Sequence, residues 1–177
     1  MEQNIVAEVP GFYRIIALKP FRRTQGVAFD LVPMELLPKI DGIDRVLHEH
    51  GAVSPGAVGS VERPWYLHPH QEDNLIVLAG KRTVDIYNLE HRSMETFTVE
   101  PQRIYKNGEL FYDGPAMLVW PCNVFHRIMS GMDGSASLNF AARYDGFDIR
   151  SNFSIYELDT KTGSYRVIRE GHLDQTS

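Results

Sequence analysis

The sequence predicts an all-β protein, an antiparallel sandwich or barrel, on two observations. Helical periodicity is scarce, whereas short runs that alternate apolar and polar residues are plentiful. These runs are roughly four to eight residues long and are separated by Gly, Pro, Asn or Asp about every 10 positions. Regular short strands with such turn residues between them are typical of antiparallel sandwiches and barrels.

The expected strands follow one another along most of the chain. Within residues 82–88, for example, Val84 and Ile86 alternate with Thr83 and Asp85, as in a strand with two different faces. In chain order, the expected strands cover residues 12–18, 27–32, 65–70, 74–79, 82–88, 94–99, 104–106, 110–112, 116–120, 124–129, 135–142, 154–158 and 165–169.

One helix is predicted, over residues 41–50, because its apolar side chains and His50 fall on one helical face and Gly51 follows as a stop. His48 and His50 are two positions apart, which on a helix places them about 200° apart and prevents them from binding one ion. We interpret His48 as exposed and His50 as part of the last turn, where a cation suits the helix dipole.

The 177 residues are expected to form one domain in three segments. Residues 1–64 supply N-terminal strands, the short helix and a loop that pack on a barrel. Residues 65–145 form the barrel core and hold both motifs described below. Residues 146–177 form a hairpin, with its loop at 159–163, and a polar tail.

Composition excludes several classes of protein. The hydrophobic fraction is 43%, and the net charge is −5 without a dense basic run, so nucleic acid is not an expected partner. The apolar run 75–79 is too short to span a membrane, and Glu2, Glu8 and Pro10 interrupt any signal peptide. Cys122 is the single cysteine, so a reducing cytoplasm is expected, and we interpret it as a packed residue, not a nucleophile.

Three histidines carry the chemical signal. His68 and His70 directly precede the apolar run 75–79, and on a strand two such residues point to the same face. Imidazole is a ligand for Zn, Fe, Mn, Ni and Cu, and a carboxylate from Glu72 or Asp73 could complete a site. The alternative is a strand end with one packed and one solvated histidine.

His126 follows a different signal. An apolar strand over 116–120 ends in a Pro-x-Asn turn, and a new strand then begins near the histidine. Asn123 suits such a turn because asparagine tolerates the left-handed conformation. The imidazole is therefore expected at the head of a strand, beside apolar neighbours. His91 and His172, in contrast, lie in polar segments and are interpreted as solvated.

These residues resemble the two motifs of the cupin superfamily of small β-barrels. The first motif is His-x-His, three or four residues, Glu, six residues and Gly; His68, His70 and Gly80 match it. Counting back from the glycine places Asp73 in the position of the acid, with a gap one residue shorter than the pattern. Counting forward from His70 selects another residue, so the candidates for the fourth ligand are Glu72, Asp73 and Asn74.

The second cupin motif is Gly, five residues, Pro-x-Gly, two residues, His, three residues and Asn. Gly114, Pro121 and His126 match it, although the gap between the first two is one residue longer. Asn123 replaces the second glycine, and Ser130 stands where the motif ends in Asn.

The resemblance implies an antiparallel jelly-roll β-barrel with one or two short helices near the N-terminal side. It further implies one divalent transition metal (Zn, Fe, Mn, Ni or Cu), with the ligands His68, His70, Asp73 and His126. Such a set leaves a coordination position open, which is characteristic of a catalytic metal.

The parity of the strands predicts what faces the interior. Tyr66, His68 and His70 would share the inner face, as would His126 and Ile128. If the polar side of strand 135–142 also faces inward, two residues could bind substrate, Asn139 by hydrogen bonds and Arg143 by reaching an anionic group at the rim. The alternative is that Asn139 caps a bulge and Arg143 is solvated.

Three functions remain open at this point. The first is a metal-dependent enzyme, of isomerase or dioxygenase type, acting on a small polar metabolite. The second is a non-catalytic barrel that binds a small molecule. The third is a metal-free epimerase resembling the deoxysugar epimerases, in which His68 or His70 is a base that works with a tyrosine.

Barrels of this class are often paired, so a homodimer is predicted. The contact is expected at the N-terminal strands or at the C-terminal hairpin, where the apolar surface would come from Phe153, Ile155, Tyr165 and Val167.

Overall fold

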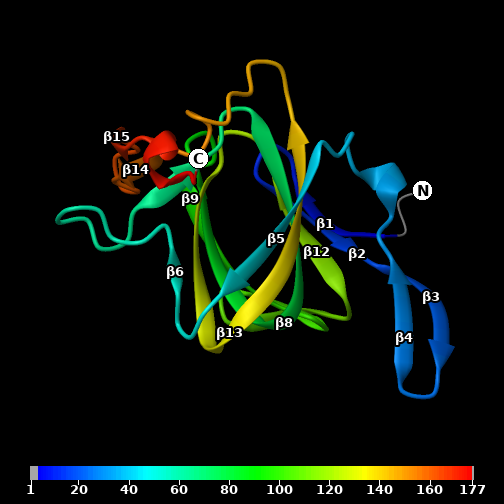
Figure 1. Cartoon of the computed structure of the whole chain (residues 1–177). Helices are drawn as coiled ribbons and strands as arrows, with labels where there is room; N and C mark the ends of the chain where they lie inside the picture. Colours follow the sequence, from blue (N-terminus) through cyan, green and yellow to red (C-terminus); the bar gives the residue numbers. More distant parts are fainter. Residues whose placement is uncertain (1–3, 177) are drawn as a thin grey trace.

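The computed structural model describes residues 4–176, and its regular secondary structure is almost entirely β-strand (Figure 1). The predicted fold class, an antiparallel jelly-roll barrel, is confirmed. Two short 3₁₀ turns accompany the strands, η1 (Met34–Leu36) and η2 (Gly171–Asp174). The strands are β1 (Ile5–Val9), β2 (Tyr13–Ala17), β3 (Lys19–Thr24), β4 (Val27–Leu31), β5 (Gly42–His48), β6 (Val53–Ser54), β7 (Trp65–Leu67), β8 (Gln71–Asn88), β9 (Ser93–Glu100), β10 (Arg103–Lys106), β11 (Glu109–Asp113), β12 (Ala116–Trp120), β13 (Phe125–Arg143), β14 (Ile155–Leu158) and β15 (Tyr165–Arg169).

Two long strands, β8 and β13, hold the barrel together because each belongs to both of its walls. The first half of β8 pairs with β12 and with the second half of β13, and its second half pairs with β9 and with the first half of β13. Sequence analysis predicted each of these long strands as two shorter ones. β5 and β6 add to β13, so the wall includes strands from the N-terminal part of the chain.

A pair of glycines allows β8 and β13 to bend together from one wall to the other. Gly80 and Gly134 both have positive φ, +68° and +73°, which glycine adopts without steric cost. A Cβ atom on Gly80 would lie 2.1 Å from the carbonyl oxygen of Gly134. The two backbones therefore approach each other at a distance that no side chain permits.

The predicted helix over residues 41–50 is wrong, because the chain forms β5 there and pairs with β13 along its whole length. Alternate residues of β5 face the barrel interior, whereas Ile43 and Leu47 are exposed. The backbone partners offered by β13 outweigh the local apolar spacing, which suited a helical face equally well. The short helix of the N-terminal side is instead η1.

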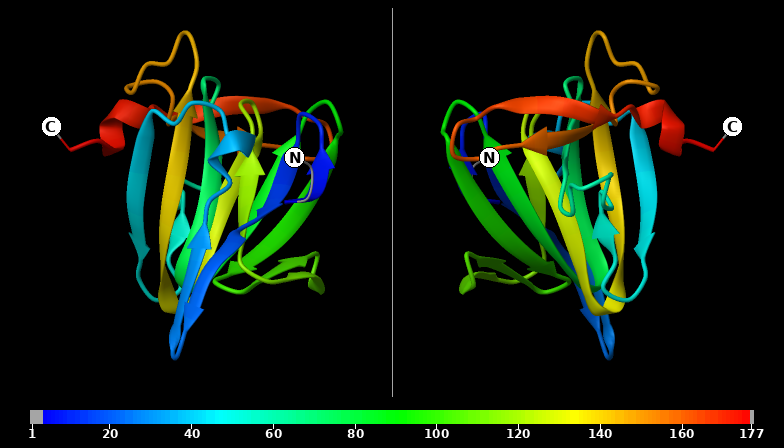
Figure 2. Two further views of the ribbon diagram at one scale, coloured as in Figure 1. Left: turned by 90° about the vertical axis from the view of Figure 1, so that its right-hand side faces the viewer. Right: turned by 90° about the vertical axis from the view of Figure 1, so that its left-hand side faces the viewer.

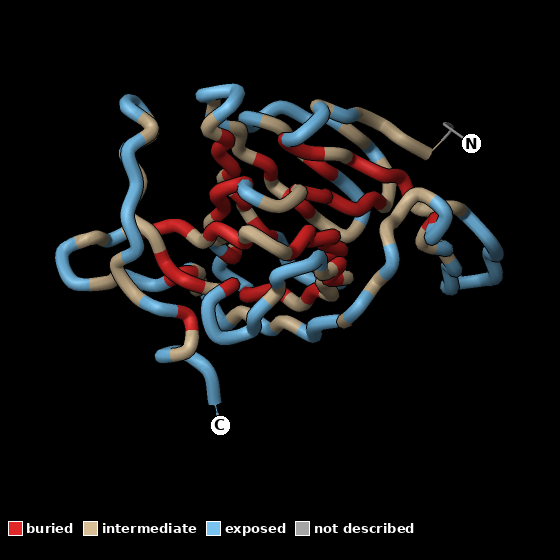
Figure 3. The backbone as a smooth tube through the Cα atoms, turned by 90° about the horizontal axis from the view of Figure 1, so that it is seen from above, coloured by how far each residue is buried: buried red, intermediate tan, exposed pale blue. Residues whose placement is uncertain are grey.

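The apolar core lies mainly between the two walls, where the buried segments gather in Figure 3. Two smaller clusters lie elsewhere: one is packed against residues 32–37, and the other against β14. The hairpin β14–β15 crosses one end of the barrel (Figure 2) and pairs with β7. The hairpin β3–β4 forms a separate two-stranded sheet that projects from the barrel (Figure 1). No helix within residues 4–176 has the length and apolar character to cross a membrane.

Candidate functional site

A cavity of about 400 Å³ lies inside the barrel, between the inward faces of β5, β8 and β13. The predicted inner-face residues Tyr66, His68, His126 and Ile128 line it. The C-terminal segment also contributes, since Phe153, Ile149, Gly171, Asp174 and Gln175 are lining residues. The size suits a small molecule.

His68 lies just after β7 and is 7% exposed. Its Nδ1 is 2.9 Å from the backbone oxygen of Asn152. A carbonyl oxygen only accepts hydrogen bonds, so Nδ1 carries the proton and donates it. In the neutral ring, Nε2 then carries a lone pair, and this nitrogen lies 3.4 Å from Asp73 Oδ2.

His126 has the same arrangement at the start of β13. Its Nδ1 donates to the backbone oxygen of Val124 at 3.1 Å, and its Nε2 lies 3.9 Å from Asp73 Oδ2. Burial, with a smaller contribution from His68, lowers the pKa of His126 to about 3. The ring is therefore neutral at physiological pH, with its Nε2 lone pair directed at the carboxylate.

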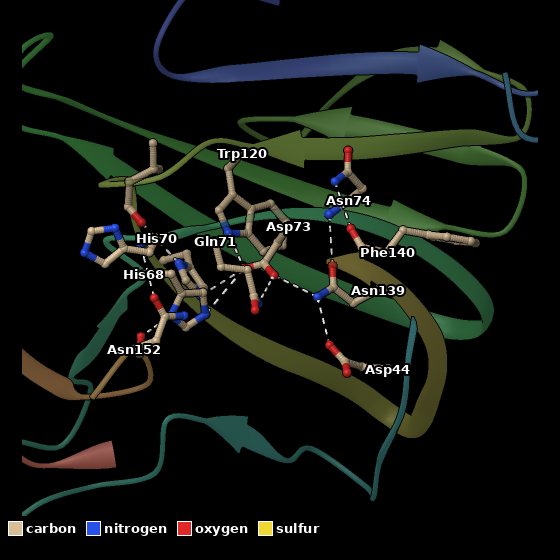
Figure 4. Close-up of polar contacts among 12 residues, drawn as sticks. Asp44, His68, His70, Gln71, Asp73, Asn74, Trp120, Asn139, Phe140 and Asn152 are labelled. Atoms are coloured by element: carbon tan, nitrogen blue, oxygen red, sulfur yellow. Dashed lines mark hydrogen bonds and ion pairs between the residues drawn. The ribbon is translucent and has the colours of Figure 1, made fainter. Parts of the chain in front are cut away.

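Asp73 is the acidic centre of the group and is 3% exposed. Its Oδ1 accepts hydrogen bonds from Gln71 Nε2 at 2.8 Å and from Asn139 Nδ2 at 2.7 Å. Its Oδ2 accepts one from Trp120 Nε1 at 3.1 Å. Figure 4 shows Trp120, Gln71 and Asn139 directed toward this carboxylate. Three neutral donors thus fix its orientation without supplying a positive charge.

Together these three side chains bring several electron-pair donors close to one another. Ligand atoms of His68, Asp73 and His126 all lie within 4.8 Å of one another. Two imidazole lone pairs facing one buried carboxylate repel it unless a proton or a metal cation lies between them. Imidazoles whose second nitrogen donates to a carbonyl group are typical of metal sites, because that bond fixes the tautomer.

The structure does not bring His70 into this group. β7 ends at Leu67, so His70 lies in a turn where the two-residue alternation of a strand no longer holds. Its ring packs against Gly146, where an added Cβ would come within 2.9 Å of it.

Of the three candidates for the acid, Asp73 alone lies beside the histidines. The preceding residue, Glu72, points to the other face of β8 and pairs with Arg14 at 3.3 Å. Asn74 donates its amide to the backbone oxygen of Phe140 at 2.8 Å. The alternation of β8 therefore selects Asp73 from the three neighbours.

Asn139 and Arg143 have different positions. Asn139 lines the cavity, but its amide is engaged by Asp73 and by Asp44, so its observed contacts position Asp73 (Figure 4). Arg143 lies outside the cavity, with its guanidinium 4.5 Å from the ring centre of Phe147. It is four residues beyond Asn139, at the end of β13.

Sequence analysis missed two cavity residues, His48 and Arg82. His48 was interpreted as exposed on a helix, whereas it lies on β5 and its Nδ1 is 3.0 Å from Ser130 Oγ. The two-residue spacing of His48 and His50 was noted, and assigning this segment to a strand would have allowed His48 to face the barrel interior. Arg82 carried no signal, since an arginine in a strand is ordinarily solvated.

Cys122 is half-buried within the second motif, directly after Pro121, and burial, with the charges of Glu72 and Asp73, raises its pKa to about 11. We expect iodoacetamide at pH 8 to alkylate it about 100-fold more slowly in the folded protein than in the unfolded chain, because the thiolate is the reactive form. Mass spectrometry with and without guanidinium measures both rates. Equal rates would contradict the expectation.

Comparison with known proteins finds similarity in structure and not in sequence. No known protein family and no curated protein matches the chain. Among solved structures, a sugar 3,4-ketoisomerase from Thermoanaerobacterium thermosaccharolyticum in complex with TDP matches with a TM-score of 0.56 and 12% identity, over 89% of each chain. A dTDP sugar isomerase from Desulfovibrio desulfuricans matches with 0.57 and 13% identity, over 79% of this chain and 85% of that one. The chain has the cupin fold.

A third cupin match is the rmlC epimerase of Mycobacterium tuberculosis, with a TM-score of 0.54 and 11% identity, over 78% of this chain and 67% of that one. The resemblance inferred from the two motifs is thereby confirmed at the level of the cupin fold. Because identities this low establish the fold alone, the chemistry of this cupin cavity has to be argued from its own residues.

Proposed function

We propose that the protein is a metal-dependent cupin enzyme that isomerises a small polar metabolite inside the barrel cavity. The observation that carries the proposal is the convergence of two Nε2 lone pairs, from His68 and His126, on the buried carboxylate of Asp73. This arrangement is electrostatically favourable only with a proton or a metal cation among the three groups.

The donor set fits a divalent transition metal. Two imidazoles and one carboxylate form a nitrogen and oxygen ligand set that divalent transition metals such as Zn, Fe, Mn, Ni and Cu accept. Gln71, Trp120 and Asn139 hold the carboxylate, and two backbone oxygens hold the imidazoles, so the ligands are oriented before binding. Three protein ligands leave positions open for a substrate.

A metal held there would polarise a carbonyl or hydroxyl oxygen of the substrate as a Lewis acid. The chain's own residues supply the surroundings. The ring of Tyr66 lies 5.9 Å, centre to centre, from both imidazoles, and burial raises its pKa, so it is a protonated hydrogen-bond donor. Trp120 packs against His126 and Phe153 against His68, and both exclude water from the cluster.

The structural matches support isomerisation of a carbohydrate-like substrate. The matched proteins are by name a sugar 3,4-ketoisomerase, a dTDP sugar isomerase and an epimerase. Isomerisation also needs no second substrate, which agrees with the size of the cavity. A dioxygenase, the other reaction type predicted, has no such support among these matches.

The second candidate is metal-free proton transfer, the epimerase-like function predicted as an alternative. It is favoured by the position of Tyr66, which lies equally close to both imidazoles and would serve as the acid. Against it, both ring nitrogens of His68 already face protein groups, Asn152 on one side and Asp73 on the other. A base needs a nitrogen free to reach the substrate.

Elemental analysis of the purified, untagged protein tests the proposal. We expect about one equivalent of metal, lost in His68→Ala and in His126→Ala, because each variant removes one of three ligands. His70→Ala is the matched control and should keep its metal, since His70 lies outside the cluster. Wild-type protein that takes up no metal on reconstitution would refute the proposal and favour the metal-free candidate.

Assembly and location are proposals as well. We propose a homodimer in which the apolar surface includes Tyr165 and Val167, 50% and 48% exposed on the C-terminal hairpin. The two other residues predicted for this contact are turned inward, since Ile155 is buried and Phe153 lines the cavity. Light scattering that finds a single 20.2 kDa species at micromolar concentration would refute the dimer. A cytoplasmic location stays a prediction.

A further inference from the structure

A second polar cluster lies in the same cavity, away from the histidines, around Arg82. Arg82 is on β8 beyond the bend at Gly80, where it pairs with Ser130 of β13. Ser130 is four residues along β13 from His126, which corresponds to about 13 Å of strand. The cavity therefore has two chemically different ends.

The guanidinium of Arg82 is a buried cation without an anionic partner. The residue is 1% exposed and lines the cavity, yet no carboxylate of residues 4–176 forms an ion pair with it. Its Nε donates to Ser135 Oγ at 2.9 Å and its Nη2 to the backbone oxygen of Val46 at 3.0 Å, while Nη1 has no protein partner among the described residues. Burial lowers the pKa of Arg82 to about 10, which still leaves it charged at neutral pH.

A chain of hydrogen bonds extends this cluster to His48. Ser135 Oγ is 2.6 Å from Ser130 Oγ, which is 3.0 Å from His48 Nδ1. Arg82 can only donate, so the chain runs outward from it when Ser135 donates to Ser130 and Ser130 donates to His48 Nδ1. Burial, with the charge of Arg82, lowers the pKa of His48 to about 4, so the ring is neutral, and with the chain in this orientation it carries its proton on Nε2. In this orientation of the chain, Arg82 and His48 are both donors toward the cavity.

We infer that this end of the cavity binds a carboxylate group of the substrate, with Arg82 and His48 as its donors. Isolated buried charges are costly, so an unpaired buried guanidinium beside a cavity indicates a charge supplied by the ligand. The guanidinium fork matches a carboxylate in geometry. This inference rests on the proposed function and names its substrate class: a small hydroxy or keto monocarboxylic acid.

The charges around the cavity favour a monoanion over a phosphate dianion. One cation and one neutral histidine balance a single negative charge, and a second charge would remain uncompensated inside the barrel. The acidic residues of the cavity, Asp44, Asp73 and Asp174, repel an anion from the other parts of the lining. The substrate carboxylate therefore belongs at Arg82, and its hydroxyl or keto groups toward Asp73.

Calorimetric titration with a matched pair of probes tests the inference. D-gluconate and D-glucitol share a six-carbon polyol skeleton and differ in the carboxylate. We expect the wild-type protein to bind gluconate at least about 10-fold more tightly than glucitol, because only gluconate supplies the missing charge. This comparison needs no variant. No difference between the two probes, or tighter binding of inorganic phosphate than of gluconate, would overturn the inference.

The variant Arg82→Met extends the test. It should weaken gluconate binding by at least about 30-fold and leave glucitol binding unchanged. Its Tm without ligand should be no lower than that of the wild type, since the substitution removes an unpaired buried charge. Unchanged gluconate binding in Arg82→Met would overturn the assignment of Arg82.

Performing the titrations in EDTA separates this inference from the proposed function. The carboxylate end of the cavity contains no metal ligand, so gluconate should remain preferred over glucitol without metal and in His126→Ala. A protein that takes up no metal on reconstitution and still prefers gluconate would refute the metal proposal alone. A metal-loaded protein that is indifferent to the carboxylate would refute the inference about Arg82 alone.

Discussion

Asp73→Asn is expected to lower metal affinity by about 100-fold or more while leaving the fold intact. Loss of a residue that only supports a ligand costs 10–100-fold in typical metal sites, so loss of the one anionic ligand should reach or exceed that range. The substitution keeps the size of the side chain and one oxygen able to accept the hydrogen bonds from Gln71 and Asn139. Only the second oxygen, which faces His68, His126 and Trp120, becomes an amide nitrogen.

Metal titration of the apo-protein, monitored by competition with a chromophoric chelator, gives the affinity, and circular dichroism checks the fold. Glu72→Gln is the matched control because Glu72 precedes Asp73 on the same strand, is also buried, and points to the opposite face toward Arg14. We expect the control to bind metal with wild-type affinity. Equal losses in both variants would indicate a general effect of charge, and Asp73 would then not be a ligand.

Gly80→Ala is expected to be the most destabilising single methyl addition in the barrel, with a loss of about 3 kcal/mol or more in the free energy of unfolding. The new Cβ would lie 2.1 Å from the carbonyl oxygen of Gly134, a backbone atom that no rotamer change can move away. The positive φ of +68° adds strain that any L-residue experiences. Urea denaturation measures the change.

Gly26→Ala separates these two contributions. Gly26 lies in the turn between β3 and β4 with φ of +74°, and no atom lies within 4 Å of an added Cβ. Gly26→Ala should therefore lower the free energy of unfolding only by the contribution of backbone conformation, about 1 kcal/mol. If Gly80→Ala lost no more than Gly26→Ala, the close approach of β8 and β13 would not be what holds the bend.

Residue spacing was sufficient to predict the fold. It also predicted two of the three residues of the cluster, His68 and His126, together with the strands beside which they lie. Strand alternation is a local property, and a pattern such as that of 82–88 reports two faces without any knowledge of partners. The cupin motifs extended the prediction beyond single strands, because each motif combines a strand end, a turn and a second strand. His68 and His126 accordingly lie where the motifs place them, at the ends of β7 and β13.

Local spacing failed where the partner of a segment decides its conformation. Residues 42–48 become a strand because β13 offers a free edge, and this edge is formed by residues some 90 positions away. His70 leaves the cluster because β7 ends three residues earlier, so the parity that aligned it with His68 is lost. Neither the free edge nor the strand end is visible in the spacing.

The choice among Glu72, Asp73 and Asn74 shows the same division. Counting residues between motif positions left all three open, because an insertion or deletion of one residue changes the answer. Pairing of β8 with β12, in which Asp73 lies opposite Trp120, settles the face on which each side chain lies. The indole then donates to that carboxylate and to neither neighbour.

The carboxylate-binding end of the cavity depended wholly on tertiary structure. Arg82 and His48 are 34 positions apart and are joined through Ser130 and Ser135 of a third strand. Burial and charge balance are properties of the assembled barrel: an arginine is an ordinary solvated side chain until three strands close around it and no acid accompanies it. Sequence patterns report which face of an element is apolar, and only the packed structure reports which charges are left without a partner.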